Sequence, residues 1–132
     1  MAENIVFPTP SNQQSESLVV QLCTAGTQAE FQGRIDDASQ LYIQAWQAVS
    51  NDYEACIAAH YVARFQKTLA ETLRWNLTAL HHAKAAGDER VKDFYPSLYL
   101  NIGRSYELLG NETEAQKYYA LAAALGVVHQ DS

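Results

Sequence analysis

Histidine side chains are the first candidates for chemistry in this 132-residue sequence, because imidazoles bind metals and transfer protons. His81 and His82 are adjacent, so on a helix their side chains would point about 100° apart. No carboxylate stands three or four residues after either of them. The pattern therefore predicts neither a metal site nor an acid–base pair here.

The two cysteines, Cys23 and Cys56, have no metal-type spacing. Each lies among apolar residues with helical periodicity, so we expect buried, reduced thiols rather than a disulfide or a zinc site. The sequence also contains no nucleophile motif, no glycine-rich phosphate loop and no paired carboxylates. These observations predict a non-enzymatic protein without a metal or other cofactor.

The overall negative charge of the chain argues against partners that are themselves strongly negative. Fifteen acidic residues against nine basic ones give a net charge of −6 and a pI near 5.0, which argues against nucleic acid and anionic membranes as partners. The opening residues MAENIVFPTPSNQQSE have no basic region or apolar run typical of a signal peptide, and no segment approaches the ~20 apolar residues of a membrane span. We therefore expect a soluble cytoplasmic protein of one domain.

Residues 99–122, YLNIGRSYELLGNETEAQKYYALA, predict two helices joined by a tight turn. The first helix has one face formed by Tyr99, Ile102, Gly103 and Tyr106. After Gly110, Asn111 with Glu114 three residues later is the pattern of a helix N-cap. The inner face of the second helix is Ala115, Tyr119 and Ala122. Small residues at these places would allow the two backbones to approach closely.

The same pattern occurs earlier in the chain. Gly26, Gly33 and Ala38 repeat the spacing of Gly103, Gly110 and Ala115, and Tyr42 and Ala45 follow. A degenerate middle copy has Cys56, Ala59, His60 and Ala63 on its first face, and Thr68 with Glu71 predicts the start of its second helix. Two registers remain open for that helix: Thr72, Asn76 and Ala79 inward, or the neighbouring stripe of Leu69, Leu73, Leu77 and Leu80. His60 stands where a small residue is expected, so we interpret it as wedged between helices, with Thr72 as a polar neighbour.

This arrangement resembles the tetratricopeptide repeat, a 34-residue helix-turn-helix unit. The resemblance implies an all-α fold: an α-solenoid of three antiparallel helix-turn-helix hairpins in a right-handed superhelical array. The repeats would span about 19–52, 53–86 and 96–127, within one domain at 15–127. A flexible segment at 1–14 would precede this domain, and a tail at 128–132 would follow it.

One departure from the family is a longer connection between the second and third repeats. His60 and Gly103 are 43 residues apart, so about nine residues are added to the usual spacing. We expect the preceding helix to continue to Ala86 and end at Gly87, with Asp88 capping a new turn. Pro96 would fall either in the first turn of the next helix or at a kink.

The resemblance also implies that binding occurs on the concave face, along the first helix of each repeat. The groove positions carried over are Val20, Cys23, Thr27, Glu30 and Phe31 in repeat one; Glu54, Ile57, Tyr61, Arg64 and Phe65 in repeat two; and Ser97, Leu100, Asn101, Arg104, Glu107 and Leu108 in repeat three. Cys23 and Thr27 do not preserve the two-carboxylate clamp of chaperone-binding members.

An aromatic and guanidinium patch is predicted instead, suited to a peptide with an acidic or aromatic side chain. The candidate peptide-binding residues are Tyr61, Arg64, Phe65, Ser97, Leu100, Asn101, Arg104 and Glu107. The middle of the chain is also locally basic, with four Lys and Arg residues against Glu71 alone between positions 55 and 87. The alternative is that the arginines only pair with Glu30, Glu54 or Glu107 across repeats.

The end of the array offers a second surface. After Ala122 the chain is too short for a further capping helix, so Tyr118, Leu121 and Leu125 are candidates for self-association, including a homodimer. The favoured function is an adaptor or regulator that binds a peptide segment of another protein in the groove. The alternatives are a structural subunit that assembles through the array ends, or a receptor for a peptide or small-molecule signal, which the lengthened central helices favour.

Overall fold

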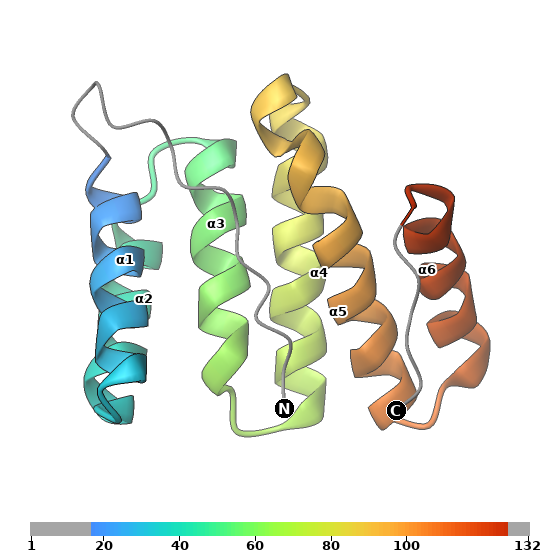
Figure 1. The fold of residues 1–132 in the computed structure, drawn as a ribbon, viewed down its shortest axis with the longest axis horizontal. Helices are drawn as coiled ribbons and strands as arrows, with labels where there is room; N and C mark the ends of the chain where they lie inside the picture. The colour runs from blue at the N-terminus through green and yellow to red at the C-terminus, as the bar shows by residue number, and fades with distance from the viewer. Residues whose placement is uncertain (1–16, 127–132) are drawn as a thin grey trace.

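The computed structural model of the protein describes residues 17–126, and all regular structure in that range is helical (Figure 1). The six α-helices are α1 (Leu18–Phe31), α2 (Ile35–Gln47), α3 (Asp52–Val62), α4 (Leu69–Ala86), α5 (Tyr95–Leu108) and α6 (Glu112–Ala124). Two 3-10 helices, η1 (Ala63–Phe65) and η2 (Glu89–Phe94), adjoin α3 and α5. The all-α prediction is confirmed for this range, whereas the predicted segments 1–14 and 128–132 lie outside the described residues.

The helices pack as three consecutive pairs. Within each pair, α1 contacts α2, α3 contacts α4, and α5 contacts α6; the pairs are joined by contacts of α2 and α1 with α3 and of α4 with α5. Figure 1 shows the pairs side by side in chain order, with α1 in front of α2 and α5 in front of part of α4. We call the side formed by α1, α3 and α5 the first-helix face.

The turns of the first and third pairs are built alike. Gly33 and Gly110 have φ values of 79° and 84°, a left-handed conformation that glycine adopts without steric cost. Around them, Arg34 N donates to the Ala29 carbonyl and Asn111 N to the Tyr106 carbonyl, the longer bond of a Schellman-type helix end. The middle pair lacks this glycine, and its first helix ends in η1 instead.

The predicted helix starts are confirmed. The side chain of Asn111 accepts a hydrogen bond from Glu114 N at 3.1 Å, and that of Thr68 accepts one from Glu71 N at 3.0 Å. Such caps satisfy amides that have no partner inside the helix, each contributing about 1 kcal/mol. They fix where α6 and α4 begin, and so which residues point inward.

The added residues lengthen the second pair as expected. The α4 helix has 18 residues and ends at Ala86, followed by Gly87 with φ of 59°. The Asp88 carboxylate then accepts a hydrogen bond from Arg90 N at the start of η2. Pro96 lies in the first turn of α5, so the helix-start alternative is confirmed over the kink.

The buried face of α4 includes Asn76 and Ala79 of the first alternative, together with Leu80 of the second at 6% exposed. Asn76 is 5% exposed and Ala79 is fully buried, whereas Leu69 is 45% exposed. At the N-terminal end of α4, the apolar stripe that begins at Leu69 therefore does not form the inner face of the helix. A polar residue, Asn76, consequently stands at the centre of the middle pair, where the other two pairs have tyrosine.

Candidate functional site

The two outer helix pairs share an arrangement of glycine, tyrosine and glutamate. In the first pair, the ring of Tyr42 lies so close over Gly26 that a methyl group at Gly26 would overlap it. The Tyr42 hydroxyl donates a hydrogen bond of 2.6 Å to the Glu30 carboxylate. The equivalent residues of the third pair are Gly103, Tyr119 and Glu107, with the same 2.6 Å bond between hydroxyl and carboxylate.

The middle pair replaces all three of these residues. At the positions 34 residues after Gly26, Tyr42 and Glu30 stand His60, Asn76 and Arg64. His60 and Asn76 are 2% and 5% exposed, and Asn76 Nδ2 donates a hydrogen bond of 3.1 Å to the buried Ser105 Oγ of α5. The middle of the structure therefore has a small polar side chain where its neighbours have a phenol ring.

A hollow of about 270 Å³ lies at this place on the first-helix face, between α3 and α5 and over α4. Its lining residues are His60, Ala63 and Arg64 from α3 and η1, Leu69, Thr72 and Asn76 from α4, and Asn101, Arg104, Ser105 and Leu108 from α5. All three replaced residues are among them. The hollow thus coincides with the break in the repeat pattern.

Arg64 is held by an acidic partner from the first pair. Its Nη2 lies 2.7 Å from Glu30 Oε2, and its Nε donates to Glu30 Oε1 at 3.2 Å. Burial alone would raise the pKa of Glu30, but hydrogen bonds from Arg64 and Tyr42 and the Arg64 charge outweigh it and lower that pKa. Burial likewise favours a lower pKa for Arg64, and the bond to Glu30 raises it. Both groups are therefore charged, and they neutralise each other.

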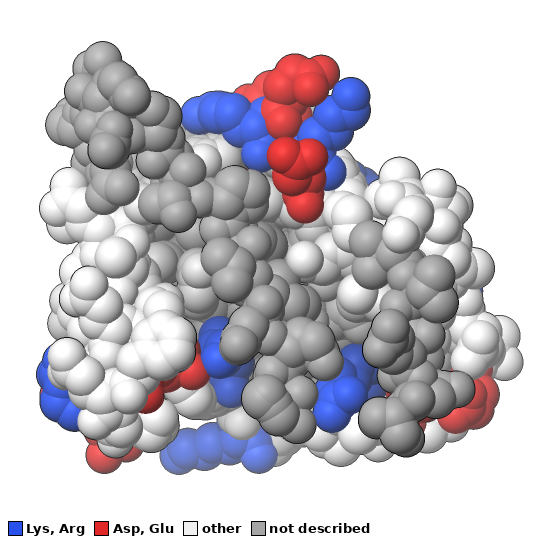
Figure 2. Space-filling view, viewed as in Figure 1, with Lys and Arg blue, Asp and Glu red and all other residues white. Residues whose placement is uncertain are grey.

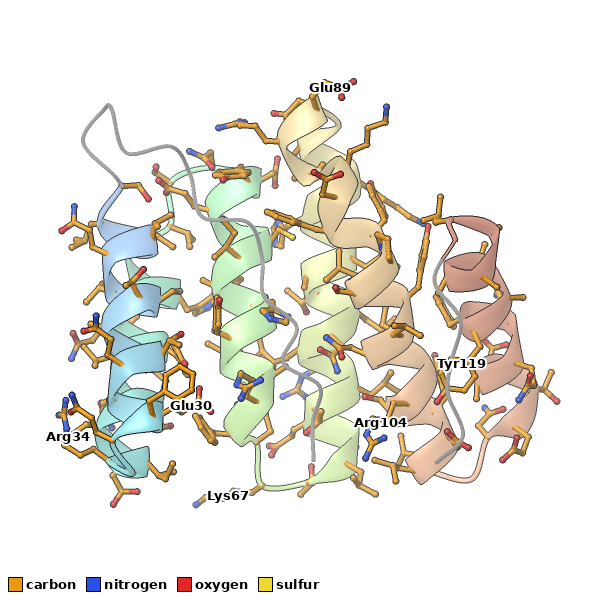
Figure 3. The ribbon with its side chains drawn as sticks, viewed as in Figure 1. Glu30, Arg34, Lys67, Glu89, Arg104 and Tyr119 are labelled. Atoms are coloured by element: carbon orange, nitrogen blue, oxygen red, sulfur yellow. The ribbon has the colours of Figure 1, made fainter. Side chains whose placement is uncertain are left out.

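Arg104 differs in having no such partner. Within residues 17–126, no hydrogen bond or ion pair joins its guanidinium to another side chain, and the residue is exposed. Figure 3 places Arg104 at the lower end of α5, away from Glu30, which lies between α1 and α3. In Figure 2, basic and acidic side chains both appear on the lower part of this face, and a mixed charged cluster lies at the upper edge near η2.

The candidate groove residues divide into three groups. Arg64, Asn101 and Arg104 line the hollow together. Tyr61 and Phe65 instead stack on the Tyr42 ring, with centroid distances of 5.1 and 5.9 Å, and so pack the second pair against the first. Ser97, Leu100 and Glu107 are not among the lining residues, and Glu107 accepts the Tyr119 hydrogen bond.

Several other positions carried over from the family face inward. Val20, Cys23, Glu54 and Ile57 are all less than 10% exposed. The Glu54 carboxylate accepts hydrogen bonds from the backbone and hydroxyl of Ser50, so it closes the turn before α3. Thr27 donates to the Cys23 carbonyl, whereas Phe31 is 85% exposed.

The three self-association candidates have different environments. Tyr118 is half-buried and stacks on Tyr106 with a centroid distance of 5.8 Å, so it is covered by its own helix pair. Leu121 and Leu125 are 39% and 53% exposed at the end of α6. Of the three candidates, Leu121 and Leu125 are the ones that expose an apolar surface.

His82, Cys23 and Cys56 contribute to packing and to contacts between helices. His82 Nδ1 lies 2.8 Å from the Asp52 carboxylate, joining α4 to the start of α3. In the part of the chain that the structure describes, no group of three or more potential ligands is placed to hold a metal ion. Cys23 and Cys56 are free, buried thiols, as predicted, and burial raises the pKa of each to about 12.

The sequence interpretation missed the roles of Asn76 and Ser105. The sequence pattern places Asn76 only in one of the two registers left open for this helix and gives it no role in a site. The signal that marks the site is the joint change at His60, Arg64 and Asn76, three positions whose residue types match between the outer pairs. Ser105 gives no such signal, because its bond to Asn76 spans two helix pairs.

Comparisons with protein-family models, with characterised proteins and with solved structures found no match. Among residues 17–126, no helix combines the length and apolar character needed to cross a membrane.

Proposed function

We propose that the three helix pairs form a right-handed array of the tetratricopeptide kind, and that this array is a non-catalytic interaction module in the cytoplasm. The matched glycine, tyrosine and glutamate residues of the first and third pairs support the repeat. The buried free thiols are in keeping with a reducing compartment. In this proposal the protein acts as an adaptor or regulator that binds a peptide segment of another protein.

The observation that carries this proposal is the hollow on the first-helix face. Its volume of about 270 Å³ lies just below the roughly 300–1,000 Å³ of drug-sized ligand sites, which suits one side chain of a longer peptide. Polar groups converge on it from α4 and α5, and Leu69 and Leu108 at its rim are 45% and 54% exposed. Apolar contacts with a few placed polar groups are the usual basis of peptide recognition.

A selection experiment tests the proposal. A displayed random-peptide library would be selected on the full chain, and enriched peptides would be measured by fluorescence anisotropy. Asn101 lines the hollow and is partly exposed, so N101W should fill the opening and weaken binding at least tenfold. Gln116 on α6 is exposed and does not line the hollow, so Q116W is the matched control and should leave affinity unchanged.

Three results would each overturn the proposal. The first is a selection that enriches no peptide with measurable affinity. The second is an enriched peptide whose affinity is the same for wild type and N101W, although thermal melts show both proteins folded. The third is equal weakening by N101W and Q116W, which would place binding outside the hollow.

The exposed leucines at the end of α6 favour a second candidate, a structural subunit that self-assembles. Leu121 and Leu125 would then be covered by a second copy of the chain. Size-exclusion chromatography with light scattering should show a dimer that L121D/L125D converts to a monomer near 14.7 kDa. A wild-type monomer across the concentration range would rule this candidate out.

A further inference from the structure

The hollow is a product of three linked changes in the middle helix pair. In the outer pairs, a tyrosine ring fills the space over a glycine, and its hydroxyl is bonded to a glutamate. In the middle pair, Asn76 is shorter than tyrosine, and Arg64 replaces the glutamate. His60 fills part of the space from the opposite helix, and the remainder is open to the first-helix face. The loss of one ring thus creates an opening in which a few polar and basic groups stand among largely apolar walls.

We propose that this opening is a specificity pocket for the side-chain carboxylate of a glutamate or aspartate in the bound peptide. This inference rests on the peptide-binding function proposed above. Arg104 is the central residue, because it lines the pocket with an exposed guanidinium that has no acidic partner within residues 17–126. A guanidinium offers parallel N–H donors whose spacing matches a carboxylate, which makes this pairing both strong and selective.

The charge balance of the pocket favours one carboxylate. Arg64 is already neutralised by Glu30 at 2.7 Å, and no aspartate or glutamate is among the lining residues. Among the lining Lys, Arg, Asp and Glu residues, the remaining charge is the single positive charge of Arg104. A carboxylate carries one negative charge and would neutralise the guanidinium of Arg104. A phosphoryl group carries about −1.5 to −2 and would leave an excess of negative charge in the pocket.

The other lining residues fit a carboxylate within a chain rather than at its end. Asn101 lines the pocket on the same helix as Arg104, one turn earlier, and supplies amide donors. Leu69 from α4 and Leu108 from α5 lie on different helices around the opening. Apolar peptide residues on either side of the acidic peptide residue can therefore contact these two leucines. An acidic residue flanked by apolar ones is therefore the expected recognition sequence.

Charge reversal provides the test. The random-peptide selection would be repeated on wild type, R104E and the control R74E, which makes the same change at an exposed α4 residue outside the pocket. Wild type and R74E should enrich Asp or Glu at one fixed position, flanked by apolar residues. R104E should enrich Lys or Arg at that position. Acidic enrichment that persists on R104E would overturn the inference.

Synthetic variants of one enriched peptide distinguish the sources of the negative charge. Replacing its acidic residue with the matching amide should weaken binding to wild type about tenfold or more, the effect of losing a hydrogen bond between charged groups. Amidation of its C-terminus should have no effect, and phosphoserine at the acidic position should not strengthen binding. Sensitivity to C-terminal amidation, or tighter binding of the phosphoserine peptide, would contradict the inference.

Different results would contradict peptide binding in the groove and carboxylate recognition in the pocket. If no enriched peptide is affected by N101W, the groove function itself is wrong. If peptides are blocked by N101W but show no acidic position and bind R104E equally well, the groove function stands and the carboxylate pocket is wrong. Thermal melts of R104E and R74E establish that both variants are folded, which is expected because both arginines are exposed.

Discussion

A double substitution that restores the repeat pattern should close the hollow and keep the fold. H60G and N76Y together give the middle helix pair the residues that the outer pairs carry at these positions. The new tyrosine ring should lie over the new glycine as Tyr42 lies over Gly26. The structure therefore predicts that each single change is harmful and that the two changes compensate.

The size of this compensation follows from the burial of the two side chains. N76Y alone forces a ring against the buried His60, at a cost of about 1–3 kcal/mol, and removes the hydrogen bond to Ser105, at about 1 kcal/mol. H60G alone leaves a cavity costing about 2–5 kcal/mol and places glycine in a helix, at about 1 kcal/mol. The double variant retains only the lost hydrogen bond and the glycine cost, while the overpacking cost and the cavity cost both disappear. We therefore expect a favourable coupling of at least about 3 kcal/mol.

Urea unfolding followed by far-UV circular dichroism measures this coupling. The free energy of unfolding would be obtained for wild type, H60G, N76Y and the double variant. We expect the double variant to be more stable than at least one single variant and to have lost peptide binding. Additive effects, within about 0.5 kcal/mol, would refute the claim that these positions form one packing unit equivalent to that of Gly26 and Tyr42.

Three further predictions concern the rest of the domain. G26A should destabilise the protein by about 1–2 kcal/mol in urea unfolding, because overlap with the buried Tyr42 ring outweighs the better helix propensity of alanine; unchanged stability would contradict the packing described. Because the pKa of Glu30 is lowered by folding, its stabilising effect is present above about pH 4.5 and lost as pH falls through the folded pKa. E30Q should therefore reduce the loss of stability between pH 5 and pH 3, and an identical loss in wild type and E30Q would argue against the ion pair. Cys23 and Cys56 should not react with a thiol reagent at pH 8 until urea unfolds the chain, and rapid reaction of the native protein would show that they are accessible.

The helix pairs could be predicted from sequence because their signals are local. Asn111 with Glu114, and Thr68 with Glu71, mark helix starts within one turn, and both caps form. The long α4 helix ending at Gly87 was also predictable, because glycine in the left-handed conformation is a common helix end. These signals need no knowledge of what packs against the helix.

The site was only partly predictable, because it depends on contacts between pairs. The sequence places Arg64 and Arg104 at candidate groove positions, but it does not decide that Glu30 binds one of them and leaves the other exposed. The Asn76 to Ser105 hydrogen bond joins residues 29 positions apart and has no sequence signature. Tyr118 is a self-association candidate from the sequence, but the sequence does not show that its half-buried ring stacks on Tyr106 of the same helix pair.

The most direct test of the account is a nuclear magnetic resonance titration of the isotope-labelled full chain with an enriched acidic peptide. We predict that the largest chemical-shift changes fall on Asn76, Asn101 and Arg104, around the hollow between α3 and α5. Changes confined to α6 near Leu121 and Leu125, or spread evenly over the surface, would contradict the central claim that this hollow is the peptide-binding site.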